Sequence, residues 1–145
     1  MHWFDLERTR SEFTRILKPG GWCAVIHNNR HLGGDAFHDA YEEFLQEFGS
    51  DYFAVKEQQV GTKRLVQFFA PNEMKCTMFA NAQELTWEGL EGRTLSSSYI
   101  PQPGHPRFEE LQRAMKRLYA EHQSDGIVTM RYDCAVCYGR LGRFA

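Results

Sequence analysis

The chain opens on an amphipathic segment followed by a short apolar run. Apolar residues recur at helical spacing from Leu6 to Leu17; Asp5 can cap this helix, and Lys18-Pro19-Gly20-Gly21 ends it. Its predicted inward face consists of Leu6, Phe13, Ile16 and Leu17. Trp22–Ile26 then lacks polar alternation, which is typical of a strand covered on both faces in a parallel sheet. Helix, tight turn and buried strand together form half of an α/β crossover unit.

Three further segments have helical spacing. The segment from Asp35 to Phe48 predicts a helix that ends at Gly49, within an acidic stretch that we expect to be a solvated face. Thr86 can cap a short helix, and Pro106 suits the first turn of a longer one. The inward residues of these three helices are Phe37, Tyr41, Phe44, Leu45 and Phe48; Trp87, Leu90 and Leu95; and Phe108, Leu111, Met115, Leu118 and Tyr119.

Two segments have the alternation of strands. Met74–Ala80 alternates loosely, whereas Ile127–Leu141 alternates clearly and is long enough that we expect a bend. The clear alternation favours an antiparallel or edge strand, with Val128, Met130, Tyr132, Cys134, Val136 and Tyr138 on one face. The segment from Ser50 to Pro71 has no pattern that decides its structure.

Composition narrows the class of protein. A chain of 145 residues, 42% hydrophobic and 25% charged, predicts one globular domain spanning residues 1–145. A net charge of −2 without a basic run disfavours nucleic acid as a partner, and the absence of a long apolar run or signal segment disfavours a membrane. Four cysteines without a secretory segment predict reduced thiols and a cytoplasmic location.

The order of several motifs resembles one known family. His2-Trp3-Phe4-Asp5, a helix, Leu17-Lys18-Pro19-Gly20-Gly21 and a strand ending in Asn28-Asn29 resemble class I S-adenosylmethionine-dependent methyltransferases. The ubiquinone/menaquinone-biosynthesis-type, trans-aconitate-methyltransferase-like branch is the most similar. Two later stretches fit this branch, namely Thr86–Leu90 with Ser96–Tyr99, and Tyr132-Asp133 with Gly139–Leu141. The resemblance implies an α/β fold that is the C-terminal part of a Rossmann-like methyltransferase domain. Its sheet would be short and mixed, with one buried parallel-type strand, antiparallel strands and covering helices.

The resemblance covers only the second half of the family's domain. Family members hold the cofactor with a glycine-rich loop after the first strand and an acidic residue that ends the second strand. Neither feature is found here, since the clustered glycines are Gly20-Gly21 and Gly33-Gly34. A truncated gene, a gene fragment and an expression fragment would all have this sequence. We therefore expect the cofactor-binding N-terminal half to be absent and S-adenosylmethionine not to bind this chain alone.

The resemblance also implies candidate site residues. His2 and Trp3 fall where the loop after the fourth strand reaches the cofactor, although Trp3 packing on the first helix is the simpler alternative. Asn28 and Asn29 end the buried strand, where α/β sheets bind ligands, and amides there could orient a substrate; an asparagine-rich turn is the alternative. Tyr99 and Tyr132 could line the acceptor pocket, but aromatic core is the preferred interpretation for both.

Catalytic residues and a metal site are not indicated. There is no Ser-His-Asp signature or phosphate loop, so the catalytic residues stay unknown. His27, His31 and His38 lack a metal-ligand spacing. Cys134 and Cys137, three apart on a strand, point to opposite faces, so we expect no bound metal and interpret them as structural thiols.

Two functions from different classes follow. The first is a substrate-side portion of a methyltransferase, whose complete parent domain transfers a methyl group to a small molecule, and which is inactive alone. The alternative is a non-catalytic α+β binding or self-associating module derived from that scaffold. In the family the Trp22–Ile26 strand pairs with the fourth strand, which has no counterpart here. The open edge predicts a homodimer or domain-swapped oligomer, unless Ser50–Pro71 folds back over it.

Overall fold

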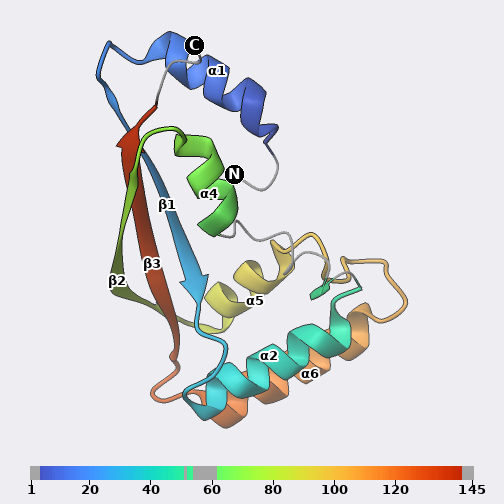
Figure 1. Cartoon of the computed structure of the whole chain (residues 1–145). Coiled ribbons are helices and arrows are strands. Elements are labelled where there is room, and N and C mark those ends of the chain that lie inside the picture. Colours follow the sequence, from blue (N-terminus) through green and yellow to red (C-terminus); the bar gives the residue numbers. More distant parts are fainter. Residues whose placement is uncertain (1–3, 51, 54–61, 142–145) are drawn as a thin grey trace. The chain divides into compact units, whose positions relative to one another are not determined.

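The computed structural model describes residues 4–50, 52–53 and 62–141 and contains helices together with one three-stranded sheet (Figure 1). The helices are α1 (Leu6–Ile16), α2 (Ala36–Phe48), α4 (Thr62–Phe69), α5 (Trp87–Leu95) and α6 (Phe108–His122). The strands are β1 (Trp22–Arg30), β2 (Met74–Leu85) and β3 (Val128–Arg140). Among the described residues, no helix has the length and apolar character that a bilayer span requires.

The sheet has the order β1-β3-β2, so the last strand of the chain lies between the first two. β3 runs antiparallel to both neighbours (Figure 1). The mixed α/β class is therefore confirmed, but the predicted mixed sheet with a parallel-type strand is wrong. Among the described residues, β1 has β3 as its neighbour on one side and no strand on the other, so it lies at the edge of the sheet.

The chain forms two compact units. The first is built from the described residues of 1–29, 58–80 and 133–145, and the second from those of 30–57 and 81–132. β2 and β3 each contribute residues to both units. Two compact units can belong to one domain, so the single-domain interpretation stays a prediction.

In the first unit, α1 and α4 pack together over a small apolar cluster. Phe13 of α1 meets Phe68 of α4 edge to face, with ring centroids 6.0 Å apart. The cluster centres on Cys23, Phe68 and Phe69. The capping of α1 is as predicted, since the Asp5 side chain accepts from the Arg8 N–H, but Ile16 is 57% exposed rather than inward.

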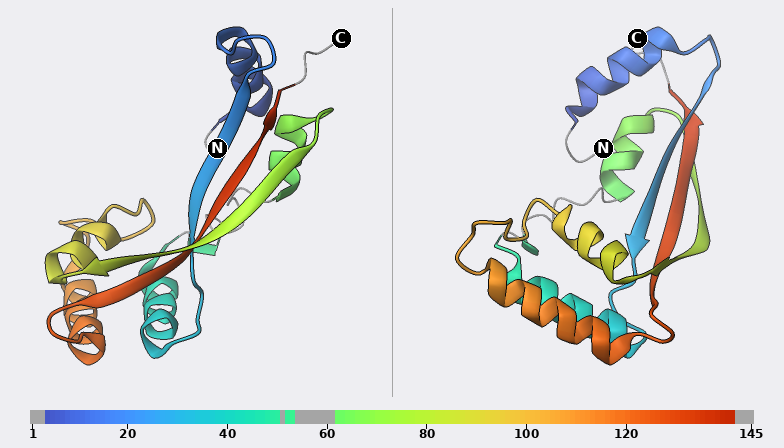
Figure 2. Two further views of the ribbon diagram at one scale, coloured as in Figure 1. Left: turned by 90° about the vertical axis from the view of Figure 1, so that its left-hand side faces the viewer. Right: turned by 180° about the vertical axis from the view of Figure 1, so that it is seen from behind.

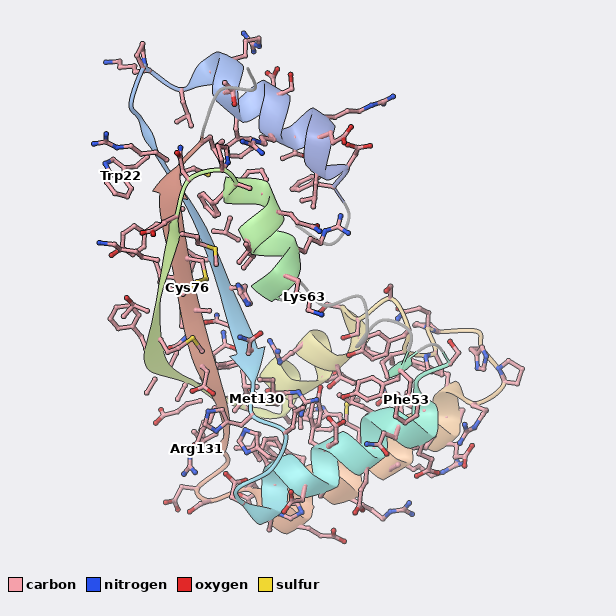
Figure 3. The ribbon with its side chains drawn as sticks, viewed as in Figure 1. Trp22, Phe53, Lys63, Cys76, Met130 and Arg131 are labelled. Carbon is pink, nitrogen blue, oxygen red and sulfur yellow. A yellow bond between two sulfur atoms is a disulfide. The ribbon has the colours of Figure 1, made fainter. Side chains whose placement is uncertain are left out.

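β1 corrects the prediction of a strand buried on both faces. Cys23 is buried, whereas Trp22 and Ile26 are 56% and 65% exposed. The side chain of Trp22 points away from α4 (Figure 3). The apolar run therefore has one covered face, which α4 and α1 provide, and one face open to solvent among the described residues.

In the second unit, α2 and α6 lie side by side and run in opposite directions (Figures 1 and 2). The five predicted inward residues of α2 are all buried, which confirms its pattern. Leu90 of α5 and Leu111 and Met115 of α6 are fully buried in the same core. The Asp35 and Thr86 side chains cap α2 and α5.

The face of β3 that is buried changes along the strand. Val128, Met130 and Tyr132 are buried in the second unit, whereas Ala135, Cys137 and Gly139 are buried in the first. The alternation therefore shifts by one residue between Tyr132 and Ala135. The predicted single face from Val128 to Tyr138 holds only as far as Tyr132, because from Ala135 onward the residues of the other parity are the buried ones.

The cysteines differ from the prediction of four reduced thiols. Cys76 and Cys137 form a disulfide between β2 and β3, while Cys23 and Cys134 are free. Cys137 is thus paired across the sheet rather than with Cys134.

The segment from Ser50 to Pro71, for which the sequence predicted no structure, contains α4 and a cis Ala70–Pro71 bond, whereas residues 51 and 54–61 lie outside the described part. The contacts of α4 are with residues on a face of the sheet, among them Cys23 and Val25.

Candidate functional site

Of the six predicted site residues, two belong to the first unit, two belong to the second, and two lie outside the described part of the chain. His2 and Trp3 lie outside the described residues. Asn28 is exposed and Asn29 half-buried on β1, within the first unit. Because the two asparagines are adjacent on a strand, their side chains leave on opposite faces. Tyr99 and Tyr132 belong to the second unit.

Tyr132 is part of the packed core of the second unit. Its side chain is 2% exposed, and its hydroxyl donates to Gln83 Oε1 at 2.8 Å. The Arg93 guanidinium lies 5.0 Å from the ring centroid. Burial raises the pKa of the Tyr132 hydroxyl, so it stays protonated near neutral pH. These contacts match the aromatic-core interpretation of this residue.

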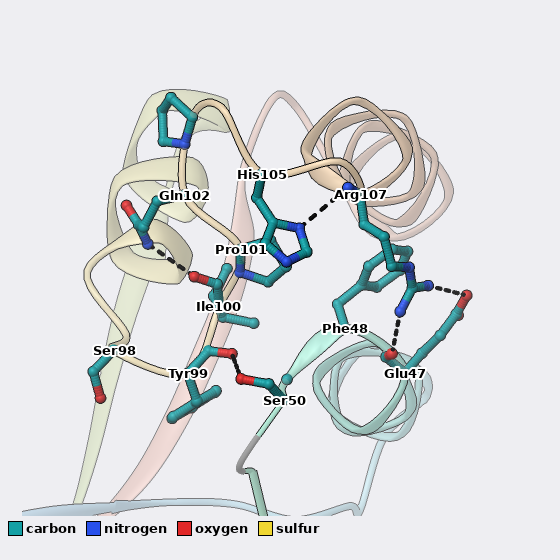
Figure 4. A pocket seen from close by; sticks show the side chains of 12 residues that line it. Glu47, Phe48, Ser50, Ser98, Tyr99, Ile100, Pro101, Gln102, His105 and Arg107 are labelled. Carbon is teal, nitrogen blue, oxygen red and sulfur yellow. Dashed lines mark hydrogen bonds and ion pairs between the residues drawn. The ribbon is translucent and has the colours of Figure 1, made fainter.

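Tyr99 lines a pocket of about 570 Å³ in the second unit (Figure 4). Its walls come from the C-terminal end of α2 and from the loop between α5 and α6; Figure 4 draws Glu47, Phe48, Ser50, Ser98, Tyr99, Ile100, Pro101, Gln102, His105 and Arg107. This volume lies in the range of pockets that bind small molecules. The Tyr99 carbonyl accepts from the Ser50 N–H at 3.1 Å, which joins the two walls.

Arg107 organises the polar side of this pocket. Its Nη1 donates to the Glu47 carbonyl at 3.0 Å and its Nε to Glu110 at 2.9 Å. The guanidinium also lies 4.6 Å from the ring centroid of Phe48. Its charge is therefore already compensated by carboxylates, and a free anion has little to gain at this place.

His105 is the titratable side chain that this arrangement presents to a ligand. Its Nδ1 accepts from the Arg107 backbone N–H at 3.1 Å, so in the neutral ring the proton resides on Nε2. The ring is exposed and stands beside Pro101 in the pocket (Figure 4). His105 can therefore donate a hydrogen bond to a bound molecule, and no spacing pattern in the sequence pointed to it.

Close packing fixes the junction between the two walls. A Cβ added to Gly49 would lie 2.7 Å from the Leu45 carbonyl oxygen, 2.9 Å from Tyr52 Cβ and 3.0 Å from Tyr99 Cδ2. Only a glycine fits without a shift of backbone atoms. The sequence marked Gly49 as the end of a helix, but its contact with Tyr99 depends on the tertiary structure.

A buried polar cluster lies behind Tyr99. The ring of Tyr52 contacts that of Tyr99 at a centroid distance of 5.4 Å, and its hydroxyl donates to Glu42 Oε2 at 2.5 Å. Arg30, at the end of β1, donates to the same oxygen at 2.6 Å. Burial and the Glu42 hydrogen bond raise the pKa of Tyr52 far above its usual range, so Tyr52 stays a hydrogen-bond donor.

Sequence reasoning missed this cluster because it placed Glu42 on a solvated acidic face. Glu42 is 8% exposed, and the Arg30 side chain is 12% exposed. A signal was present: Glu42 lies four residues after His38 and three before Leu45, and both of these are buried. The cluster holds the end of β1 to α2 and supports the pocket wall.

His38, which is buried, pairs with the half-buried Asp35. His38 is fully buried; its Nδ1 lies 2.8 Å from Asp35 Oδ1, and its Nε2 accepts from the Arg131 N–H at 2.9 Å. Burial opposes ionisation of Asp35, but the His38 hydrogen bonds and the Arg131 charge together lower its pKa. Because both ring nitrogens have partners, His38 is a structural link between α2 and β3 rather than a free base.

The loop at Gly33 and Gly34 does not offer a free helix N-terminus to the cofactor that the sequence resemblance implies. Gly33 and Gly34, with φ of +140° and +94°, do stand between a strand and a helix. However, the Asp35 carboxylate caps that helix by accepting from the His38 N–H at 3.0 Å, so a carboxylate occupies the place of a ligand. Among the described residues, no three His, Cys, Asp or Glu side chains are grouped as metal ligands.

Comparison with known proteins leaves the family open. No protein-family model matches the chain, and no curated protein is similar to it. The function must therefore be inferred from three features, which are the arrangement of the sheet, the pocket at Tyr99 and the resemblance of the sequence motifs.

Proposed function

We propose that this chain forms the substrate-side, C-terminal portion of a class I S-adenosylmethionine-dependent methyltransferase domain. The observation that carries the proposal is the position of β1, which lies at the sheet edge and has β3 on one side. In the family, the strand after the Lys-Pro-Gly-Gly turn pairs with the fourth strand on its other side. A free edge at this strand is what a domain half without the fourth strand would have.

The antiparallel strands support the same assignment. The resemblance implies a domain that ends in antiparallel strands, and β2 and β3 are antiparallel. Helix α1, the turn at Lys18–Gly21, β1 and α2 follow each other in the order that the resemblance requires. The proposal includes two further statements. The fold derives from a Rossmann-like methyltransferase domain, and the protein is located in the cytoplasm.

In the proposed function the chain contributes recognition of a small-molecule methyl acceptor. Methyl transfer from a sulfonium relies on the cofactor for its chemistry, and the protein positions the acceptor. The pocket at Tyr99 has a suitable volume, an aromatic wall and one imidazole donor in His105. Since the sequence lacks the family's glycine-rich loop and ribose-binding carboxylate, the chain alone is expected to be inactive.

The test compares two lengths of the protein. The DNA upstream of the Met1 codon is read first, and any in-frame extension is expressed beside the 145-residue chain. Calorimetry with S-adenosylmethionine should give one-to-one binding for the extended protein and no measurable heat for the shorter chain at high micromolar concentration. An extension without a glycine-rich loop, or saturable binding by the shorter chain, would contradict the proposal.

A second candidate is a non-catalytic module that associates with a copy of itself. The observation that favours it is the same open edge, because β1 also exposes Trp22 and Ile26. Unpaired edges are templates for pairing with another chain. A genuine translation start at Met1, with a homodimer by light scattering, would favour the module. A mass near 16.9 kDa at all concentrations would exclude the dimer.

A further inference from the structure

The disulfide between Cys76 and Cys137 joins two residues that are 61 positions apart in the chain. Their Cα atoms lie 4.1 Å apart, so the two residues face each other across β2 and β3. Both belong to the first unit, and Figure 3 shows the bond on the sheet. Nothing in the proposed methyl transfer uses it.

The two cysteine residues of the disulfide differ in their exposure to solvent. Cys76 is exposed on the edge strand β2, whereas Cys137 is 3% exposed on the central strand β3. Thiol–disulfide exchange begins with attack of a thiolate on an accessible sulfur. An external thiolate can therefore reach Cys76, with Cys137 as the leaving group.

Side-chain burial contributes little to the attachment of β2, which leaves the backbone pairing with β3 and the crosslink to hold it. Every residue of β2 from Lys75 to Glu84 is exposed, and Met78 and Phe79 are 55% and 54% exposed. Packing therefore contributes little to holding the strand, and as an edge strand it has β3 as its neighbour on one side. The start of β2 is held separately, because Asn72 Nδ2 donates to the Arg140 carbonyl at 3.0 Å.

We propose that the Cys76–Cys137 disulfide is a redox-modification site, at which a dithiol reductant reversibly opens the crosslink and loosens β2 from β3 within the first unit. One thiolate of the dithiol forms a bond to Cys76 Sγ, and Cys137 leaves with the electron pair and takes up a proton. The second thiol of the reductant loses its proton and attacks the first sulfur of the reductant, so that Cys76 leaves and is protonated. The dithiol becomes a disulfide, and two electrons and two protons pass to the protein.

The remaining cysteines are poor competitors in this exchange. Cys23 is buried, and burial raises the pKa of its thiol, which keeps it protonated and weakly nucleophilic. Cys134 is half-buried and lies three residues from Cys137 on the same strand. A Cys134→Ser variant therefore retains the disulfide and serves as a matched control for Cys76→Ser, which removes it at an exposed position.

The test measures amide hydrogen exchange by mass spectrometry in air-oxidised protein and after treatment with dithiothreitol in native buffer. Peptides covering residues 75–80 should exchange roughly tenfold faster or more after reduction, while peptides from α2 and α6 stay unchanged. Reoxidation with glutathione disulfide should restore slow exchange. Oxidised Cys76→Ser should resemble the reduced protein, and oxidised Cys134→Ser the oxidised one.

Three results would overturn the proposal. The first is equal exchange over residues 75–80 in the two states of the wild-type protein, because the crosslink would then not hold the strand. The second is reduction that proceeds only in denaturant, which would define a purely structural bond. The third is alkylation of all four cysteines when the air-oxidised protein is unfolded in denaturant without a reductant, which would show that the bond does not form.

Discussion

Replacing Glu42 by glutamine removes the negative charge from the buried cluster while nearly preserving the shape of the side chain. Arg30 Nη2 lies 2.6 Å from Glu42 Oε2, and the two side chains are 12% and 11% exposed. At an effective dielectric constant of about 20, Coulomb's law gives an attraction of about 6 kcal/mol at that distance. Desolvation of the two ions offsets most of this attraction in the wild-type protein.

The variant keeps the desolvation of Arg30 but loses the attraction. Removing one partner of a buried ion pair costs about 3–5 kcal/mol. An amide oxygen can still accept from Tyr52, and the guanidinium stays 5.1 Å from the ring centroid of Tyr41, so we expect about 3 kcal/mol. For a chain of this size that loss corresponds to a fall in Tm of about 10 °C.

Urea unfolding measures this loss. Trp87 packs against the core of the second unit, so its fluorescence, in a background with Trp3 and Trp22 replaced by phenylalanine, reports on the unit that contains the cluster. Glu43→Gln makes the same chemical change at the neighbouring exposed position and should stay within about 0.5 kcal/mol of the background protein.

A double variant separates the charge from the packing. Arg30→Met with Glu42→Leu replaces both ions by apolar side chains and should regain much of the stability that Glu42→Gln loses, because neither charge then remains buried. The reasoning is refuted if Glu42→Gln unfolds at the same urea concentration as the Glu43→Gln control. Equal losses for the double variant and Glu42→Gln would show that packing, not charge, is what matters.

Three further predictions concern the second unit. Phe44→Asp places an unpaired charge at a position that is 5% exposed, so the protein should unfold or aggregate, and a soluble variant with wild-type melting would contradict the packing of α2. Gly49→Ala should cost about 1–3 kcal/mol and displace Tyr99, observable as a chemical-shift change of its ring protons; an unchanged spectrum would argue against the close contact. The pKa of Asp35 is lower in the folded than in the unfolded chain, so its contribution is full above about pH 4 and is lost as the pH falls further. In Asp35→Asn, the free energy of unfolding should depend less steeply on pH below about pH 4. An equally steep dependence in the variant would show that other groups cause it.

Helices α1, α2, α5 and α6 could be predicted from local sequence, whereas α4 lies in the segment from Ser50 to Pro71, whose pattern decides nothing. Asp5 and Thr86 cap α1 and α5 as expected, and Gly49 follows α2; Asp35, expected as the first residue of α2, is its cap. Capping and apolar periodicity act within one or two turns of a helix, so they need no knowledge of distant residues. The buried face of α2 follows for the same reason, because its apolar residues can share only one face.

Of the candidate site, the sequence indicated Tyr99 but not its neighbours. The pocket needs the end of α2 beside the loop that precedes α6, and these segments are about fifty residues apart, as the Ser50–Tyr99 hydrogen bond shows. Arg30, Glu42 and Tyr52 likewise meet only after the chain has folded. The sequence therefore suggested an aromatic residue of the site, while its polar partners were assigned to loops and solvated faces.

The strands show most clearly what the sequence left undecided. The apolar run at the start of β1 predicts burial, but the number of faces that are covered depends on which elements pack there, and α4 and α1 cover one. The Cys76–Cys137 pair follows from the register of β2 against β3, which links residues 61 positions apart. Periodicity is a local property of the chain, whereas strand neighbours, register and burial are set by long-range packing, and so only the tertiary structure decides them.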